Sequence, residues 1–157
     1  MARCIIDYNE KYFMVYSSYL EIIMSYMSEV VVEKRYYNEE WLKEYDREVL
    51  IGKMGCFASF LNFNLDIYLN SPNRIKQFNV LIEDTKHKFL NIKEITYDDI
   101  KKRQVKSLLN TESRWIIDAF PFSIKGFLFV LQLIEDLINT NFDNTYNKKT
   151  IFLSDFE

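Results

Sequence analysis

The sequence predicts an all-α fold, a single-domain bundle of about six or seven helices. Only 3 glycines and 2 prolines occur among the 157 residues, so long stretches run without a helix breaker. An all-β sandwich needs a turn about every ten residues and is therefore disfavoured. Apolar residues make up 48% of the chain, and in several segments they recur at spacings of three and four. We expect one domain spanning residues 1–157, since this length is typical of one.

The first helix is expected over residues 8–31. Asp7 followed by Glu10 has the form of an N-cap with a capping-box acid three residues on. Behind this cap, one apolar stripe is formed by Phe13, Tyr16, Leu20, Ile23, Met27 and Val30. Spacings that alternate between three and four place these side chains on one face of a helix.

A second helix is expected to begin after Asn38, an N-cap residue followed by two glutamates that suit the positive end of the helix dipole. Its inner face is formed by Leu42, Tyr45 and Val49. Gly52 is expected to end or kink it. Residues 56–69 are apolar nearly all round, which predicts a helix in the middle of the bundle.

Two further helix starts are marked by caps. Ser71 places an N-cap before Pro72, the residue type favoured at the first helical position. The helix that follows has an apolar stripe formed by Ile75, Phe78, Ile82, Thr85 and Phe89. Thr96 with Asp99 forms a second capping box at the start of another helix.

The last third of the chain predicts a short helix, a break and one long helix. The short helix is expected over residues 111–119, and Pro121 ends it. The long helix is expected over residues 122–138. Residues 139–150 are polar and resemble a linker, whereas residues 151–157 turn apolar again and are expected to dock on the bundle as a tail.

Charge and cysteine usage narrow the class of protein. The net charge is −3, and 11 acidic residues outnumber 7 basic ones within residues 1–70, which disfavours nucleic-acid binding. Cys4 and Cys56 lack metal-type spacing and follow no secretory signal, so we expect two thiols in a reducing cytoplasm. The most apolar window, residues 115–138, is interrupted by charged residues and a proline, so no membrane span is expected.

A row of glutamates spaced four apart is the candidate partner-binding surface. Like charges at this spacing disfavour an isolated helix by roughly a few tenths of a kcal/mol per pair. Such a row is either a solvated face or a surface that attracts a basic protein, and nearby aromatic residues would anchor the contact. Paired acids for general acid–base catalysis are a third reading, which no histidine or metal ligand supports. The candidate set is Glu40, Glu44, Glu48, Trp41, Tyr36 and Tyr37.

Other polar residues do not assemble a catalytic or metal centre. His87 is the only histidine, and zinc, di-iron and Ser-His-Asp sites need a second imidazole or a nearby nucleophile. Asp66 and Asp118 interrupt apolar windows, and their burial would indicate a functional pocket. A basic patch, read mainly as a solvated face, is formed by Lys101, Lys102, Arg103 and Lys106. We therefore expect no enzyme activity, no metal and no cofactor.

The chain resembles the immunity proteins of bacterial toxin systems, including contact-dependent growth inhibition. The resemblance lies in size, acidity, cytoplasmic character and a composition rich in Asn, Lys, Ile and Tyr. It covers the whole chain and contains no motif, so no family residue is carried over. It implies a non-enzymatic inhibitor that occludes a basic toxin domain such as a nuclease. Carboxylates such as Glu40 and Glu44 would then pair with Lys and Arg of the toxin.

Two alternatives from other classes stay open. A Bcl-2-like bundle takes a partner helix in an apolar groove, and residues 56–69 would be its central helix. The sequence shows no NWGR-like segment, and we expect no membrane-anchoring tail. A small-ligand-binding or enzymatic bundle would instead enclose Tyr and carboxylate groups in a pocket. An exposed acidic and aromatic patch, an open apolar cleft and a closed polar pocket distinguish the three functions.

Overall fold

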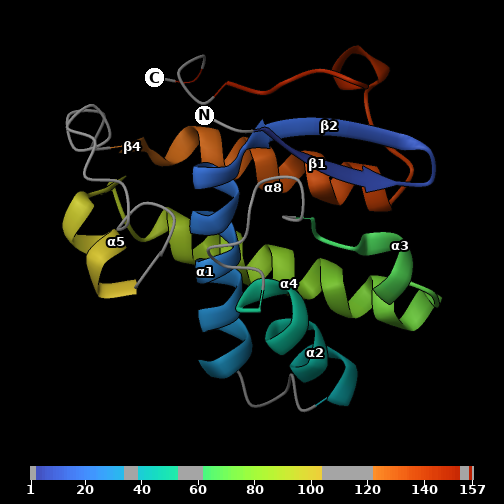
Figure 1. Ribbon diagram of the computed structural model, residues 1–157, viewed down its shortest axis with the longest axis horizontal. Coiled ribbons are helices and arrows are strands. Elements are labelled where there is room, and N and C mark those ends of the chain that lie inside the picture. Colours follow the sequence, from blue (N-terminus) through green and yellow to red (C-terminus); the bar gives the residue numbers. More distant parts are fainter. Residues whose placement is uncertain (1–2, 34–38, 53–61, 104–121, 153–155, 157) are drawn as a thin grey trace.

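The computed structural model describes residues 3–33, 39–52, 62–103, 122–152 and 156. The all-α prediction is wrong, because two small antiparallel sheets accompany the helices in this part of the chain. The fold is therefore mixed, with helices predominating (Figure 1). No helix among the described residues is long and apolar enough to cross a membrane.

Among the described elements, a hairpin is followed by a run of helices, and two further short strands stand between the later helices. The described elements are β1 (Arg3–Tyr8), β2 (Lys11–Tyr16), α1 (Ser17–Glu33), α2 (Glu40–Tyr45), the π-helix η1 (Asp46–Leu50), α3 (Leu65–Tyr68), α4 (Pro72–Leu90), β3 (Glu94–Ile95), α5 (Tyr97–Arg103), β4 (Phe122–Ser123), α8 (Ile124–Ile138) and the 3₁₀ turn η3 (Asn144–Tyr146).

A β-hairpin stands where the sequence predicted the first half of a long helix. Its turn residues, Asn9 and Glu10, have φ angles of 50° and 68°, as a two-residue hairpin turn with both central residues left-handed requires. Asp7 is consequently a strand residue of β1 and does not cap a helix. The helix α1 begins only at Ser17, so the expected helix over residues 8–31 is correct for its second half alone.

The sequence did not predict the hairpin, because the apolar residues of this segment fit both the spacing of a helix and the alternation of a strand. Phe13 and Tyr16 are three apart and extend the helical stripe of α1 backwards. In β2, however, Phe13 and Val15 face the core while Met14 and Tyr16 are only half-buried. This alternation is the period of a strand with one covered face. The turn also lacks glycine, the usual signal for a tight hairpin.

The core lies between α1, α4, α8 and the inner face of the hairpin. Figure 1 shows α4 and α8 running alongside each other and α1 crossing α4. The helix α4 begins as predicted, because the Ser71 side chain accepts a hydrogen bond from the Arg74 amide and Pro72 occupies the first turn. Its predicted inner face is buried, apart from a half-buried Ile75: Phe78, Ile82, Thr85 and Phe89.

The short second sheet joins the segment before α5 to the start of α8. Ile95 of β3 pairs with Phe122 of β4, and both side chains are buried. The capping box at Thr96 is confirmed, since its amide donates to Oδ2 of Asp99 at 2.9 Å. The long helix α8 begins two residues later than expected, with Ser123 as its N-cap. The expected helix over residues 111–119 lies outside the described residues.

The expected central helix over residues 56–69 is not found in its described part. Residues 62–64 are not helical, and Asn64 has a φ of 51°. A single helical turn, α3, follows. In α3 the Ile67 side chain is 68% exposed, because a one-turn helix cannot bury every side of an apolar sequence. The remainder of this segment lies outside the described residues.

Residues 148–151 run alongside β2. The Lys148 amide donates to Tyr12 O at 2.7 Å, the Met14 amide to Lys149 O at 2.8 Å, and the Ile151 amide to Met14 O at 2.8 Å. The C-terminal segment thereby covers one edge of the hairpin (Figure 1). Within residues 139–150, expected to resemble a linker, Phe142 is buried and stacks on Phe13.

Candidate partner-binding surface

The glutamate row lies on one exposed face because the helix that carries it widens. Between positions 41 and 50, two buried residues alternate with two exposed ones, which is a repeat of four residues. One turn of an α-helix takes only 3.6 residues. The wider turn of the π-helix η1 compensates for this mismatch. Its defining hydrogen bond runs from the Ile51 amide to Asp46 O, five residues back, at 2.8 Å. Glu40, Glu44 and Glu48 therefore all stay exposed.

Gly52 allows the widened turn to end where it does. A Cβ atom at this position would lie 2.4 Å from the carbonyl oxygen of Arg47 and 2.8 Å from that of Glu48. Both oxygens belong to the backbone, so they cannot move aside without changing the turn. The prediction that Gly52 ends or kinks its helix is confirmed in this form.

The charges of the row are only partly balanced. Glu40 is paired with Lys43 at 3.5 Å, and its side chain is 91% exposed. Glu48 is paired with Arg47 at 3.3 Å, with both side chains mostly in solvent. Exposed pairs of this kind contribute little to stability and are easily exchanged for pairs with another molecule. Within the described residues Glu44 forms no ion pair.

Tyr68 of α3 extends this surface beyond the glutamate row. Its ring packs edge-on against that of Tyr45 at 4.9 Å, which joins α3 to α2. Burial raises the pKa of the Tyr68 hydroxyl, and the carboxylates of Glu44 and Glu48 raise it further. The Arg47 guanidinium partly offsets this rise in pKa, so the Tyr68 hydroxyl responds to the charges of the glutamate row. We call Glu40, Glu44, Glu48 and Tyr68 the acidic surface.

Further exposed residues flank the acidic surface. Ile67 and Asp66 precede Tyr68 in α3, and both are exposed. Asp66 accepts a hydrogen bond from the Asn9 amide at 3.2 Å, so it also ties α3 to the hairpin turn. Ile51, just after η1, is 51% exposed. Interfaces combine an apolar centre with a polar rim, and exposed apolar side chains beside carboxylates are compatible with that arrangement.

Trp41, one of the predicted anchors, points into the molecule. Its side chain is 7% exposed, its Nε1 donates to Oε1 of Gln77 at 2.6 Å, and the Arg74 guanidinium lies 5.2 Å from its ring centre. Trp41 therefore fixes α2 against α4 beneath the glutamate row. Tyr36 and Tyr37 lie outside the described residues.

A buried carboxylate lies on the inner side of the same helix. Asp46, the first residue of η1, is 8% exposed, and among the described atoms its Oδ1 has no hydrogen-bond partner. Burial raises the pKa of Asp46, and a hydrogen bond with Ser28 of α1 only partly offsets this. The sequence pattern did not single out Asp46, because an acid beside exposed Arg47 and Glu48 resembles a surface residue.

The remaining sequence candidates do not converge on one site. Asp66 is exposed, so the burial that would have suggested a pocket is missing there. Asp118 lies outside the described residues. His87 is exposed, and its Nδ1 lies 2.9 Å from the carbonyl oxygen of Glu83. No group of three or more metal-ligating side chains gathers in the described part of the chain.

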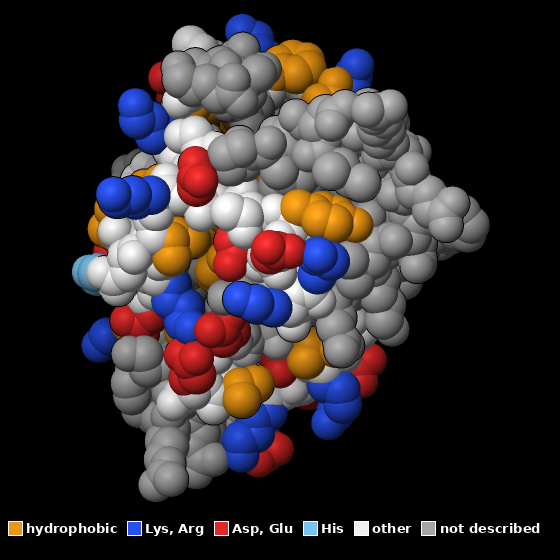
Figure 2. All heavy atoms as spheres, turned by 90° about the vertical axis from the view of Figure 1, so that its left-hand side faces the viewer, with side chains coloured by type: hydrophobic (Ala, Val, Ile, Leu, Met, Phe, Trp, Pro, Cys, Tyr) orange, Lys and Arg blue, Asp and Glu red, His pale blue; other side chains and the backbone are white. Residues whose placement is uncertain are grey.

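The basic patch is balanced by acids where it is described. Lys101 forms an ion pair with Asp98 at 2.9 Å and lies over the ring of Tyr97 at 5.2 Å. Figure 2, which views the molecule from the α5 side, shows basic and acidic side chains interspersed over this face. Lys102 is exposed. The Arg103 side chain and Lys106 are outside the described residues.

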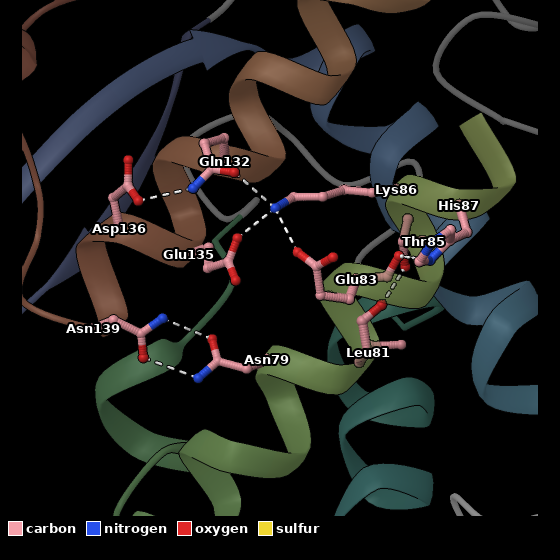
Figure 3. A network of polar contacts seen from close by, with 10 residues as sticks. All are labelled: Asn79, Leu81, Glu83, Thr85, Lys86, His87, Gln132, Glu135, Asp136 and Asn139. Atoms are coloured by element: carbon pink, nitrogen blue, oxygen red, sulfur yellow. Dashed lines mark hydrogen bonds and ion pairs between the residues drawn. The ribbon is translucent and has the colours of Figure 1, made fainter. Parts of the chain in front are cut away.

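Among the described residues, a dense polar cluster lies where α4 meets α8 (Figure 3). The Lys86 ammonium, only 13% exposed, donates to Glu83 Oε1 at 2.7 Å, to Gln132 Oε1 at 2.8 Å and to Glu135 Oε2. Burial lowers the Lys86 pKa, but the hydrogen bonds with the two carboxylates outweigh this, so the net change is upward. The cluster joins two helices through satisfied charges.

A shallow hollow beside the C-terminal segment has a volume of about 200 Å³. It is lined by Phe129 of α8 together with Tyr146 and Phe156, whose rings lie 5.4 Å and 4.4 Å from that of Phe129. Lys149 also lines it. Pockets for small ligands are typically about 300–1,000 Å³, so this hollow is small for one.

Comparison of the chain with known proteins identified no relative. No protein-family model matches the chain, and neither the curated proteins nor the solved structures contain a significant match.

Proposed function

We propose that this protein is a non-enzymatic protein-binding module that acts in the cytoplasm and inhibits a basic partner by covering it. The proposed partner is a toxin domain such as a nuclease, in the manner of bacterial immunity proteins. The observation that carries the proposal is the acidic surface, where a row of three exposed glutamates is held in line by a π-helix.

The chemistry of this surface suits a partner rich in Lys and Arg. Carboxylates that face solvent attract such a partner over several ångströms and accelerate its association. On contact, charge-assisted hydrogen bonds to the carboxylates replace the weak pairs with Lys43 and Arg47. Tyr68 contributes a ring and a hydroxyl at the edge of the row, the combination favoured at the centre of interfaces.

The fold supports this role by keeping the row rigid. Trp41 and Tyr45 anchor its helix to α4 and α3 from beneath. Gly52 permits the π-helix that keeps the glutamates aligned. A surface that needs no reordering on binding loses less conformational entropy when the partner docks. Inhibition then follows from covering the partner's own basic, substrate-binding face.

The test is an affinity capture from source lysate at low salt, followed by association kinetics with the captured protein. The Glu40→Lys/Glu44→Lys double variant should associate at least about tenfold more slowly, because steering depends on these charges. The wild-type rate should fall as salt rises, since screening shortens the reach of exposed charges. Stoichiometric addition of wild-type protein should abolish the activity of the partner.

The matched control is Glu10→Lys/Glu94→Lys, which changes the net charge equally at two exposed positions away from α2. It should associate nearly as fast as wild type. If both double variants associate equally fast at low salt, the acidic surface is not the docking site and the proposal fails.

A further inference from the structure

In the part of the chain that the structure describes, the edge of β1 opposite β2 has no backbone partner. A two-residue turn joins Tyr8 to Lys11, so Tyr8, Ile6 and Cys4 direct their backbone groups towards β2. Arg3, Ile5 and Asp7 alternate with them. Their N–H and C=O groups therefore point away from β2.

The two edges of the hairpin are treated differently. The edge of β2 is covered by residues 148–151, which bond to Tyr12 and Met14. At the β1 edge, no backbone group of the described chain pairs with Arg3, Ile5 or Asp7. Natural sheets usually protect such an edge with charged side chains, especially Lys, with Pro or with a covering segment. β1 contains neither Lys nor Pro, and its two charged residues, Arg3 and Asp7, have opposite signs.

The side chains at this edge are complementary to themselves. Arg3, Ile5 and Asp7 share the outer face of the strand, with Arg3 and Ile5 exposed and Asp7 half-buried. One carboxylate oxygen of Asp7, Oδ1, accepts a hydrogen bond from Asn62 Nδ2 at 3.2 Å, so Oδ2 is the oxygen left for a second copy. A second β1 that approaches antiparallel, centred on Ile5, places each Arg3 opposite the Asp7 of the other copy. It also places the two Ile5 side chains opposite each other. Opposite charges and paired β-branched residues are the favourable cross-strand pairs.

The hydrogen-bond pattern agrees with the same register. In an antiparallel pair, residues whose backbone groups face each other exchange two hydrogen bonds. In the register centred on Ile5, residues whose backbone groups point away from β2 pair only with one another. Ile5 pairs with Ile5, and Arg3 pairs with Asp7 in both directions. A shift by one residue would oppose inward-facing groups and lose this match.

We propose that the chain forms a symmetric homodimer in which two β1 edges pair antiparallel and join the two hairpins into one sheet. A two-fold axis passes between the Ile5 residues, as an isologous contact requires. The contact is short, so the expected Kd is on the order of 100 µM. This inference is independent of the acidic surface, which lies on α2, η1 and α3.

The test is sedimentation velocity on the full chain from about 10 µM to about 1 mM, a range that brackets the expected Kd. Ile5→Pro removes an amide that faces the second copy and leaves the bonds to β2 intact. It should raise the Kd at least about tenfold. Asp7→Arg should do the same by placing arginine opposite Arg3.

The Arg3→Asp/Asp7→Arg double variant should restore dimerisation, because the opposite charges are exchanged and not lost. Glu10→Arg is the matched control, since it makes the same charge change at the exposed turn and should leave the Kd unchanged. Circular dichroism of each variant checks that the hairpin has folded. The Glu40→Lys/Glu44→Lys variant should dimerise like wild type, which separates this inference from the proposed function.

A chain that stays monomeric up to about 1 mM overturns the proposal, given the weak contact expected. So does a dimer whose Kd Ile5→Pro leaves unchanged, because the contact then lies elsewhere. Hydrogen exchange gives the last discrimination. If the Ile5 amide is protected only when a different protein is bound, the edge receives a foreign strand and self-pairing is wrong.

Discussion

The indole nitrogen of Trp41 donates a hydrogen bond to Oε1 of Gln77 at 2.6 Å, and this contact joins α2 to α4. The Arg74 guanidinium lies over the same ring. Trp41 therefore packs on the inner side of α2 and holds in place the helix that carries the glutamate row. Its contribution should appear in stability, and it should affect partner binding only through the position of α2.

Trp41→Ala should lower the free energy of unfolding by about 3–5 kcal/mol, as is typical for loss of a buried large aromatic side chain. Trp41→Phe retains most of the packing but leaves Gln77 without its donor, so a smaller loss of about 1–2 kcal/mol is expected. Urea unfolding measures both. Equal losses for the two variants would show that the hydrogen bond, and not the ring, carries the contribution of Trp41.

Asp46 should reduce stability at neutral pH, because its carboxylate is buried with one oxygen unpaired in the described structure. Burial raises the pKa of Asp46 above its ordinary value. A raised carboxyl pKa contributes stability that is fully present below the unfolded value, 3.8, and is lost as the pH rises through the folded value. At neutral pH the charged form therefore opposes folding.

Asp46→Asn should accordingly raise the free energy of unfolding at pH 7, by about 1 kcal/mol. The difference from wild type should shrink as the pH falls towards 3.8, where the wild-type carboxyl is neutral as well. Glu44→Gln makes the same chemical change at an exposed position and should alter stability little. A pH-independent gain in Asp46→Asn would attribute the effect to packing and not to charge.

Lys86 should stabilise the contact between α4 and α8 through its two carboxylate partners. Lys86→Met leaves Glu83 and Glu135 facing each other without a cation, and should cost about 1–3 kcal/mol. Lys76→Met, at an exposed position of the same helix, is the control. Thermal or urea unfolding at pH 7 compares the two variants.

The pH dependence of the Lys86 contribution has a definite sign. The hydrogen bond from Lys86 lowers the pKa of Glu83 below 4.5. A lowered carboxyl pKa gives stability that is present above 4.5 and lost as the pH falls through the folded value. The loss caused by Lys86→Met should therefore diminish below about pH 4.5. A loss that persists undiminished in acid would contradict the electrostatic account.

The features that the sequence predicted correctly depend on residues close together in the chain. Ser71 with Pro72, and Thr96 with Asp99, satisfy backbone amides within one helical turn, so their role can be recognised locally. The exposure of the glutamate row was predicted in part from spacing, because residues four apart lie close together on a helix, although the π-helix η1 completes the alignment.

The features that were missed depend on distant contacts. The hairpin is stabilised by residues 148–151, which bond to β2 from the far end of the chain. The turn of the hairpin, Asn9–Glu10, contains no glycine, the residue type by which such a turn is usually recognised in a sequence. Tyr68 joins the acidic surface only because the ring of Tyr45 packs against it from another element. The π-helix could not be predicted from the sequence either. Its widened turn matches a pattern of buried and exposed residues, and that pattern is defined only by the folded core.

Two phenylalanines of α8, two positions apart, should differ strongly in their contribution to stability. Phe127 is fully buried and stacks on Phe89 with ring centres 5.5 Å apart. Phe129 is half-buried and contacts Tyr146 and Phe156 beside the C-terminal segment. The two side chains thus belong to different layers, one in the core and one at its edge.

Phe127→Ala should cost about 3–5 kcal/mol, whereas Phe129→Ala should cost about 1–2 kcal/mol, because less surface and a smaller cavity are involved. Phe129→Ala should also speed amide exchange at Ile151, whose N–H bonds Met14 O only while the C-terminal segment stays in place. Urea unfolding and hydrogen exchange measure the two effects. If Phe129→Ala costs as much as Phe127→Ala, the C-terminal segment is part of the cooperative core and not a layer laid over it.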